Sequence, residues 1–242
     1  MKIDAKILGG AILVVAIVVI LVVLAPNLSK KQQEEVSPTQ EETTEETTPG
    51  EETTTEEETT PGEETTETLG EILSKAGDIA SVKYDLIMTS EGMPSTTQKV
   101  WLKKNKMKTE TTVEKNTQIS IIDMDAKTIY MYLPAQNIAT KMDFSDAPES
   151  PIESVKNVEN YNPVVIGSET IDGKVCIVYE VTVEGTKVKY WVWKERGFPI
   201  KVEAETSEGK VTTEYKNIEF EDIPDSVFEL PKGVQIMDFP TE

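Results

Sequence analysis

The stretch Val82-Lys83-Tyr84-Asp85-Leu86-Ile87-Met88-Thr89 decides the fold class of this chain. Large apolar side chains occupy every second position from Val82 to Met88, and mostly polar ones stand between them. An alternation with a period of two is typical of a β-strand that buries one face. The sequence therefore predicts that a sheet begins directly after Ser81.

Similar short segments follow on both sides of position 150. Turn residues such as Glu91-Gly92 and Asp125-Ala126-Lys127 separate them, as in an antiparallel meander. Strands are expected over 82–88, 99–104, 106–113, 118–124 and 128–133, with a further one near 139–144. A second group is expected over 174–184, 187–194, 200–206 and 210–220. About nine strands do not stay flat, because strand twist curls such a sheet into a barrel or half-barrel.

Two helices accompany the predicted strands. Thr68-Leu69-Gly70-Glu71 matches a capping box, and apolar residues then recur at helical spacing up to Ala80. Ser150-Pro151-Ile152-Glu153 is a second capping box and starts a short helix that ends near Val158. The predicted fold over 69–242 is mainly antiparallel β with two helices (α+β): a curled, incomplete β-barrel with a helix lid.

The N-terminal segment 1–29 predicts a membrane anchor. Residues 7–25 carry no charge and, apart from two glycines, are apolar, which is about the length that crosses a hydrocarbon core of ~30 Å. A cleavable signal peptide is the competing interpretation, although Pro26 follows Ala25 and makes a poor cleavage site. We expect a single-pass signal anchor in the cell membrane, with the C-terminal domain extracytoplasmic.

Residues 30–68 predict a disordered linker rich in Thr and Glu. The segment 34–68 holds 14 Glu residues and no base, and Pro-Gly interrupts it twice. Such a tract has almost nothing to bury and repels itself, so an extended chain is expected. Thr-rich tracts with Pro also resemble O-glycosylated stalks, so the linker is either a plain acidic spacer or a glycosylated stalk.

The composition excludes several classes of protein. The whole chain has 24 basic and 44 acidic residues, a formal charge of −20, which argues against nucleic acid as a partner. The chain has no His, and Cys176 is its single Cys, so His-based catalysis and Cys or His metal sites are excluded. We expect a domain that is not an enzyme, with no cofactor and no metal.

An apolar ligand is the chemistry that the strands favour. Apolar residues occur on both faces of several strands, so one face builds the core and the other is covered, paired or used for binding. Methionines add adaptable side chains of the kind found at promiscuous apolar sites. The predicted ligand-binding residues are Leu86, Met88, Met107, Met124, Met131, Leu133, Val181, Tyr190, Trp191 and Trp193. For each of them an ordinary core position is the alternative, and the two tryptophans could instead anchor a membrane or a partner.

Five segments carry a family resemblance. They are the N-terminal helix that begins Leu-x-x-Ile-Leu at Leu69, the basic stretch 101–108, the hairpin 121–134 that ends in Tyr-Leu-Pro, the hairpin 190–201 with Trp193 and Gly-Phe-Pro, and the closing segment 223–233. In this order the segments resemble the outer-membrane lipoprotein carrier (LolA-like) family over most of 69–242. The resemblance implies a half-barrel that holds acyl chains in an apolar cavity beneath its helices.

These observations give two hypotheses of function. The first is a membrane-anchored extracytoplasmic protein that binds a lipid acyl chain or a lipidated protein, similar to lipoprotein carriers. The second is a cell-envelope sensor or protein-interaction module that uses the same half-barrel to bind a partner protein.

Overall fold

The computed structural model describes residues 67–113, 116–145, 150–183, 185–207 and 209–238. The predicted anchor and the predicted linker up to position 66 lie outside these residues, so both stay predictions. Within the described ranges, no helix is both long enough and apolar enough to cross a membrane.

Twelve strands make up most of the described chain. The first six are β1 (Ser81–Ser90), β2 (Thr96–Lys103), β3 (Lys106–Val113), β4 (Asn116–Asp123), β5 (Thr128–Leu133) and β6 (Ile138–Asp143). The other six are β7 (Val164–Ile171), β8 (Lys174–Val183), β9 (Thr186–Trp193), β10 (Phe198–Thr206), β11 (Gly209–Glu219) and β12 (Gln235–Asp238). The prediction of a mostly β domain is therefore confirmed.

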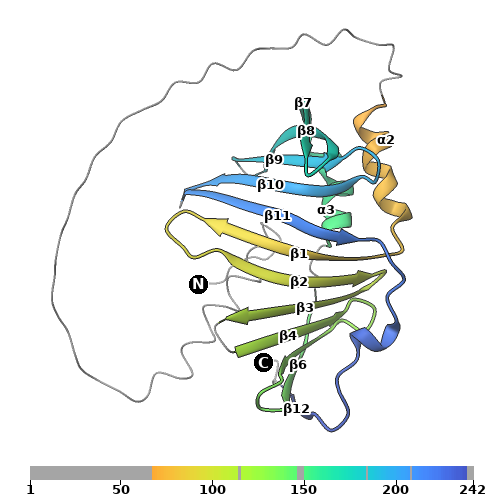
Figure 1. Cartoon of the computed structure of the whole chain (residues 1–242), viewed down its shortest axis with the longest axis vertical. Helices are drawn as coiled ribbons and strands as arrows, with labels where there is room; N and C mark the ends of the chain where they lie inside the picture. Colours follow the sequence, from red (N-terminus) through yellow and green to blue (C-terminus); the bar gives the residue numbers. More distant parts are fainter. Residues whose placement is uncertain (1–66, 114–115, 146–149, 184, 208, 239–242) are drawn as a thin grey trace, which may run out of the picture.

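All twelve strands belong to one open, curled sheet (Figure 1). Their order is β12-β6-β5-β4-β3-β2-β1-β11-β10-β9-β8-β7, so β12 and β7 are the two edges. The strands β1 and β11, which are far apart in sequence, pair in the middle and join the two meanders. The incomplete barrel predicted from the sequence is thus a sheet whose edges do not meet.

Two strands escaped the sequence prediction, which gave about nine strands in a wholly antiparallel sheet. β7 has no buried alternation to reveal it, because almost all of its side chains are exposed. β12 is four residues long and fully exposed, and it pairs with β6 in parallel. The path of the C-terminal segment places β12 beside β6, where Asn137 Nδ2 donates to the Gly233 carbonyl over 2.9 Å.

The two predicted α-helices are present, and both are short. α2 (Leu69–Ser74) continues as the 3-10 helix η2 (Lys75–Asp78), and α3 (Pro151–Asn157) continues as η3 (Val158–Tyr161). A third 3-10 helix, η4 (Asp225–Phe228), lies near the C-terminus.

Both capping boxes are confirmed. Glu71 N donates to Thr68 Oγ1 over 3.3 Å, and Thr68 N donates to Glu71 Oε2 over 2.7 Å. Hydrogen bonds from Thr68 hold the pKa of the Glu71 carboxyl below its usual range. The same reciprocal pair joins Ser150 and Glu153, over 3.2 and 2.8 Å.

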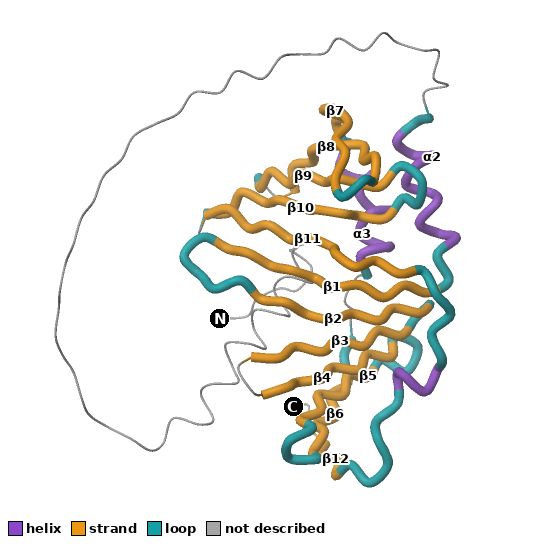
Figure 2. The backbone as a smooth tube through the Cα atoms, in the orientation of Figure 1, coloured by secondary structure: helices purple, strands orange, loops and turns teal. Residues whose placement is uncertain are grey.

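The sheet has an inner face, on which the helices pack, and an outer face. Ile72, Leu73 and Val155 of the helices join inner-face residues such as Tyr84 and Val188 in the main hydrophobic core. α3 contacts β10, and η3 contacts β8. No α-helix among the described residues overlies β3–β6 in Figure 2. The helices therefore cover one half of the inner face.

The outer face has two smaller clusters. Cys176, Val178, Trp191 and Ile200 form one of them. In the other, Ile223 and Phe228 of the C-terminal segment pack on Ile121 and its neighbours. Lys103 fastens this segment, because its Nζ donates to the Ile223 carbonyl over 2.6 Å and pairs with Asp225 over 3.0 Å.

Gly197, in the turn between β9 and β10, allows α2 to approach the sheet. Its φ is +64°, and a Cβ at this position would lie 2.4 Å from the Ile72 carbonyl oxygen and 2.8 Å from Ala76 N. Gly173, in the turn between β7 and β8, also has a positive φ of +75°, but a Cβ there would meet no atom within 4 Å.

We therefore expect Gly197→Ala to lower the free energy of unfolding well beyond the conformational cost alone. A left-handed backbone costs a non-glycine residue about 1–2 kcal/mol. Gly173→Ala should show about that loss, and Gly197→Ala should exceed it because the helix must also move. Urea unfolding of both variants measures the difference, and equal losses would contradict the close packing of α2.

Candidate functional site

The inner face of β1–β6 carries a continuous apolar row across six strands. Directly paired residues of neighbouring strands point to the same face and lie about 4.5–5.5 Å apart. The registers place in one row, from β1 to β6, Val82, Leu102, Met107, Ile122, Ile129 and Met142. With strands about 4.8 Å apart, this row is roughly 24 Å long.

Polarity increases along the strands away from this row. The next row contains Tyr84, Val100, Thr109, Ser120, Met131 and Thr140. The row beyond it begins with Leu86 and continues with Gln98, Thr111 and Gln118. Gln98 Nε2 donates to Thr111 Oγ1 over 2.7 Å across the strands. The inner face of β1–β4 is therefore amphipathic, with an apolar row at one side and amides at the other.

Burial of the inner face differs between its two halves. Beneath the helices, Tyr179, Val188 and Phe198 are almost fully buried. On β5 and β6, by contrast, Ile129, Met131 and Met142 are only half-buried, and Leu133 is 37% exposed. The apolar inner face therefore extends beyond the part that the helices cover.

Aromatic rings fill the covered half. Phe198 lies between Tyr84, Tyr215 and Phe220, with ring centroids 5.5, 5.6 and 5.9 Å away and edge-to-face geometry. Tyr179 stacks on Tyr190 with centroids 5.1 Å apart. Side chains thus occupy the space directly beneath the helices, where the family resemblance implied a cavity.

The Tyr179 hydroxyl is a polar atom buried in this aromatic cluster. It has no hydrogen-bond partner among the residues that the structure describes, and the side chain is fully buried. Burial raises the pKa of Tyr179 well above its usual value, since ionisation would leave a charge in an apolar surrounding. The hydroxyl is therefore neutral and unsatisfied in this arrangement.

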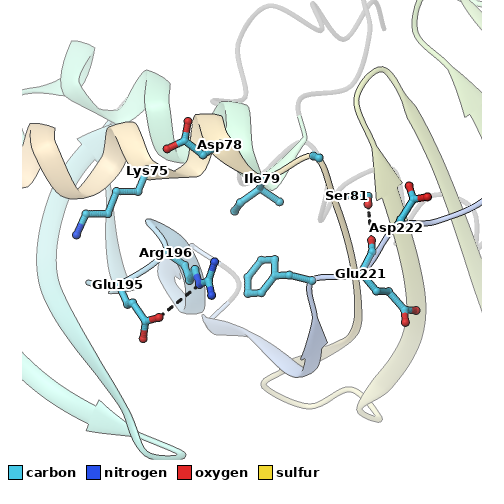
Figure 3. Close-up of a pocket in the computed structure, with 10 residues that line it drawn as sticks. Lys75, Asp78, Ile79, Ser81, Glu195, Arg196, Glu221 and Asp222 are labelled. Carbon is cyan, nitrogen blue, oxygen red and sulfur yellow. Dashed lines mark hydrogen bonds and ion pairs between the residues drawn. The ribbon is translucent and has the colours of Figure 1, made fainter.

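A pocket of about 380 Å³ opens where α2–η2 meets the ends of the strands (Figure 3). Ile79 and Phe220 give it an apolar floor, and both side chains also pack against the main core. Its rim is charged, with Lys75, Asp78, Glu195, Arg196, Glu221 and Asp222. Pockets of this size lie at the small end of those that hold small molecules.

Contacts within the chain hold the basic side chains of this rim. Lys75 Nζ donates to the Lys194 carbonyl over 2.7 Å and pairs with Glu67, also over 2.7 Å. Arg196, the single Arg of the chain, lies over the Phe220 ring at 5.3 Å from its centroid. The pocket therefore offers an apolar floor beside a cation that already rests on an aromatic ring.

The structure divides the predicted site residues between the two faces. Strand alternation and the registers place Leu86, Met88, Met107, Met131, Leu133, Val181 and Tyr190 on the inner face. Met124, just beyond β4, packs against the main core. Trp191 and Trp193 belong to the outer-face cluster. The ten residues therefore do not form one site. Five of them belong to the main core or pack against it, whereas Met88, Met131 and Leu133 share only the inner face.

Trp191 has contacts of its own on the outer face. Its Nε1–H donates to Glu169 Oε2 over 2.5 Å, and Lys201 Nζ lies 4.6 Å from its ring centroid. These contacts hold a side chain that is almost fully buried. Adjacent strand residues point to opposite faces, so Tyr190 and Trp191 cannot contact the same ligand on one face.

Sequence reasoning missed several residues of the inner face and the pocket. Ile129 and Met142 complete the apolar row, and Ile79, Arg196 and Phe220 line the pocket. The alternation of apolar and polar residues within 128–133 and 139–144 could have identified Ile129 and Met142. The pocket residues come from three distant segments, and only the position of the single Arg beside Gly197 hinted at them.

Titratable groups in the described part of the chain offer little chemistry of other kinds. No group of three or more acidic, His or Cys side chains there is placed to hold a metal ion. Cys176 is fully buried, and burial raises the pKa of its thiol to about 11, so the thiolate is scarce at neutral pH.

Comparisons with known sequences match part of this domain. Residues 83–197 match a family model described as "Domain of unknown function (DUF4412)". An uncharacterized protein of Methanocaldococcus jannaschii is 33% identical over 129 residues, covering 48% of this chain and 37% of the relative. The chain thus matches little more than a third of the length of that relative.

Comparisons with solved structures find one protein that shares the overall fold and others with lower structural similarity. An uncharacterized conserved protein from Thermus thermophilus has a TM-score of 0.52 at 12% identity, covering 70% of this chain and 98% of that one. The Pseudomonas aeruginosa MucA/MucB complex gives 0.46 at 11% identity, with 70% and 63% covered. A LolA superfamily protein from Nitrosomonas europaea gives 0.33 at 16% identity, with 67% and 97% covered. A LolA superfamily protein is thus among the similar structures, while the matching family model has another description.

We expect Tyr179→Phe to raise the free energy of unfolding by about 1 kcal/mol, because it removes a buried hydroxyl that has no partner. Tyr132→Phe is the matched control, since its hydroxyl reaches Asn137 Oδ1 over 3.4 Å and its removal should bring no gain. Urea unfolding measures both variants. A destabilised Tyr179→Phe would mean that the hydroxyl has a partner.

Proposed function

We propose that this domain binds an amphiphile, either a lipid acyl chain or a lipidated protein, on the inner face of its sheet and without catalysis. The apolar row from Val82 to Met142 is the observation that carries the proposal. Its first four members, from Val82 to Ile122, are already almost fully buried, and the row continues onto β5 and β6, where Ile129 and Met142 are half-buried. An acyl chain laid along it would remove the exposed part of these side chains from water.

The gain from such binding is hydrophobic. Each methylene group moved from water into an apolar site contributes about 0.8 kcal/mol, so a few groups already give a measurable affinity. The half-buried Met131 and Met142 suit ligands of variable shape, because methionine is unbranched and has three rotatable bonds. This argues for a class of apolar chains rather than one rigid ligand.

The polar side of the inner face suits the other end of an amphiphile. Gln98 and Thr111 form a hydrogen-bonded pair, and Gln118 follows on β4. Amide and hydroxyl groups there can donate to and accept from a polar headgroup without a fixed charge. We therefore place the acyl chain on the half-buried apolar surface of β5 and β6 and the polar end toward the glutamines.

A second candidate function is binding of a partner protein, as in a cell-envelope sensor. The exposed apolar edge strand β7 favours it, because such edges pair with other chains. One of the similar solved structures is a complex between MucB and MucA of Pseudomonas aeruginosa. This binding of a partner protein is a property of those two proteins. The two functions use different parts of the sheet, so a single domain can have both.

The proposed setting is the extracytoplasmic side of the cell membrane. The uncharged segment 7–25 would be the anchor, and the Glu-rich tract before the domain would hold it away from the lipid surface. An anchored domain of this kind retains or senses amphiphiles near its own membrane, and does not diffuse between two membranes.

We expect a photoreactive fatty acid, added to membranes that contain the full chain, to label peptides from β4–β6. Met131→Gln should reduce this labelling at least tenfold, because it puts an amide into the half-buried apolar surface. Ile87→Gln is the control, since Ile87 is also half-buried but points to the outer face. Mass spectrometry of the labelled peptides gives the result. Labelling confined to 7–25, or unaffected by Met131→Gln, would refute the proposed site.

We also expect the full chain to stay with membranes after a wash with alkaline carbonate, and a variant lacking residues 1–29 to be released. The apolar run of 7–25 supplies the retention. The N-terminal sequence of the purified full chain provides the check. A mature chain that begins after position 25 would show a cleaved signal peptide instead.

A further inference from the structure

The edge strand β7 exposes an apolar segment at one end of the sheet. Val164, Val165 and Ile166 are 62%, 50% and 50% exposed. β7 is the last strand in the sheet order and pairs only with β8 among the described strands. Figure 1 shows it at the top of the sheet, far from β6 and β12. Its outer side therefore presents backbone N–H and C=O groups that have no strand beside them.

The β7 edge has few of the charged side chains that protect edge strands, although the register shift between Val165 and Gly167 marks a bulge. Lysines commonly block such edges, but β7 contains none, and its single charged residue is Glu169. The Glu169 carboxylate already accepts a hydrogen bond from Trp191. Pro163 precedes the strand and leaves the apolar segment itself unblocked. An exposed edge that begins with three uncharged apolar residues is typical of an interaction site.

We propose that the β7 edge binds an extended segment of a partner protein as an added strand, and that this segment combines apolar residues with basic ends. Main-chain hydrogen bonds to β7 would supply much of the affinity, and side chains beside Val165 would supply contact on the inner face. This surface lies at the opposite end of the sheet from Ile129 and Met142, so the inference is independent of amphiphile binding.

A second copy of the chain fits this edge poorly. The register between β7 and β8 shifts between Val165 and Gly167, which marks a bulge in the middle of the strand. In an antiparallel pair of two β7 strands, both bulges would interrupt one ladder of eight residues. A free peptide can adapt to one bulge, whereas two identical rigid edges cannot both adapt.

Charge also selects the partner. Residues 69–242 hold 20 bases and 29 acids, a net charge of −9, and the tract 34–68 adds 14 Glu residues to each copy. Two copies therefore repel each other, whereas a segment with basic ends is attracted and associates faster at low salt. Glu180, opposite Val164, is half-buried and already pairs with Lys187 over 3.2 Å, so the attraction of a basic end comes from the net charge of the chain.

The test uses the full chain in lipid nanodiscs and two synthetic peptides of ten residues. Both peptides alternate Val and Thr, and they end in two Lys or in two Glu residues. Hydrogen–deuterium exchange should show that the Lys peptide slows exchange across Val164–Ile171, while the Glu peptide gives at least tenfold weaker protection. Val165→Glu should weaken binding of the Lys peptide at least tenfold.

Ile236→Glu is the matched control, because Ile236 is 52% exposed on β12, the other edge of the sheet. This variant should bind the Lys peptide like the unmodified chain. Val164→Glu, at the most exposed position of β7, is the second variant if Val165→Glu does not fold. Thermal unfolding confirms that each variant is folded.

Four outcomes would overturn the proposal. The first is no protection of β7 by the Lys peptide, and the second is equal protection of β12. The third is protection of β7 in the absence of peptide that increases with protein concentration, together with a dimer in analytical ultracentrifugation. This result would show that a second copy of the chain occupies the edge. The fourth is protection of β7 by anionic vesicles and not by the peptide, which would make the edge a membrane contact.

Discussion

The two α-helices are short, and this limits how much of the sheet they can cover. The rest of the structure depends on this limit. α2 and α3 have six and seven residues, so each is about 10 Å long at a rise of 1.5 Å per residue. A twelve-stranded sheet is roughly 50 Å wide at a spacing of about 4.8 Å. The helices can therefore cover the inner face of only part of the sheet, around β8–β11. The approach of α2 to Gly197 fixes which part that is.

The apolar surfaces that the helices do not cover have different surroundings. On the outer face, Trp191 and its neighbours pack against one another, and the C-terminal segment covers Ile121. On the inner face of β5 and β6, Ile129 and Met142 stay half-buried, and at the β7 edge the side chains are exposed. The proposed amphiphile site and the proposed peptide site are these two surfaces. Both follow from the mismatch between a wide sheet and short helices.

The sequence predicted the elements whose local signals agree with their final environment. Alternation located β1 and most of the meander, and the Thr68 and Ser150 capping boxes located the starts of both helices. β7 and β12 were missed because neither buries one face, so no alternation exists to be read. The candidate site was predicted in part, because strand alternation identifies which residues share a face within one strand. It does not say which face of one strand continues that of another. Grouping Trp191 with Tyr190 was a separate error, because the two are adjacent on β9 and alternation already places them on opposite faces.

The sequence by itself determined the class of the fold, the chain order of its main elements and the types of chemistry that are absent. Those properties depend on local periodicity, on capping residues and on composition, including a chain without His. Only the tertiary structure decided the registers that align Val82 with Met142, the filling of the space beneath the helices by Tyr179 and Phe198, and the exposure of β7. These properties depend on contacts between residues far apart in the chain. Pairing β1 with β11, for example, joins segments more than 100 residues apart and sets the relation between the two meanders.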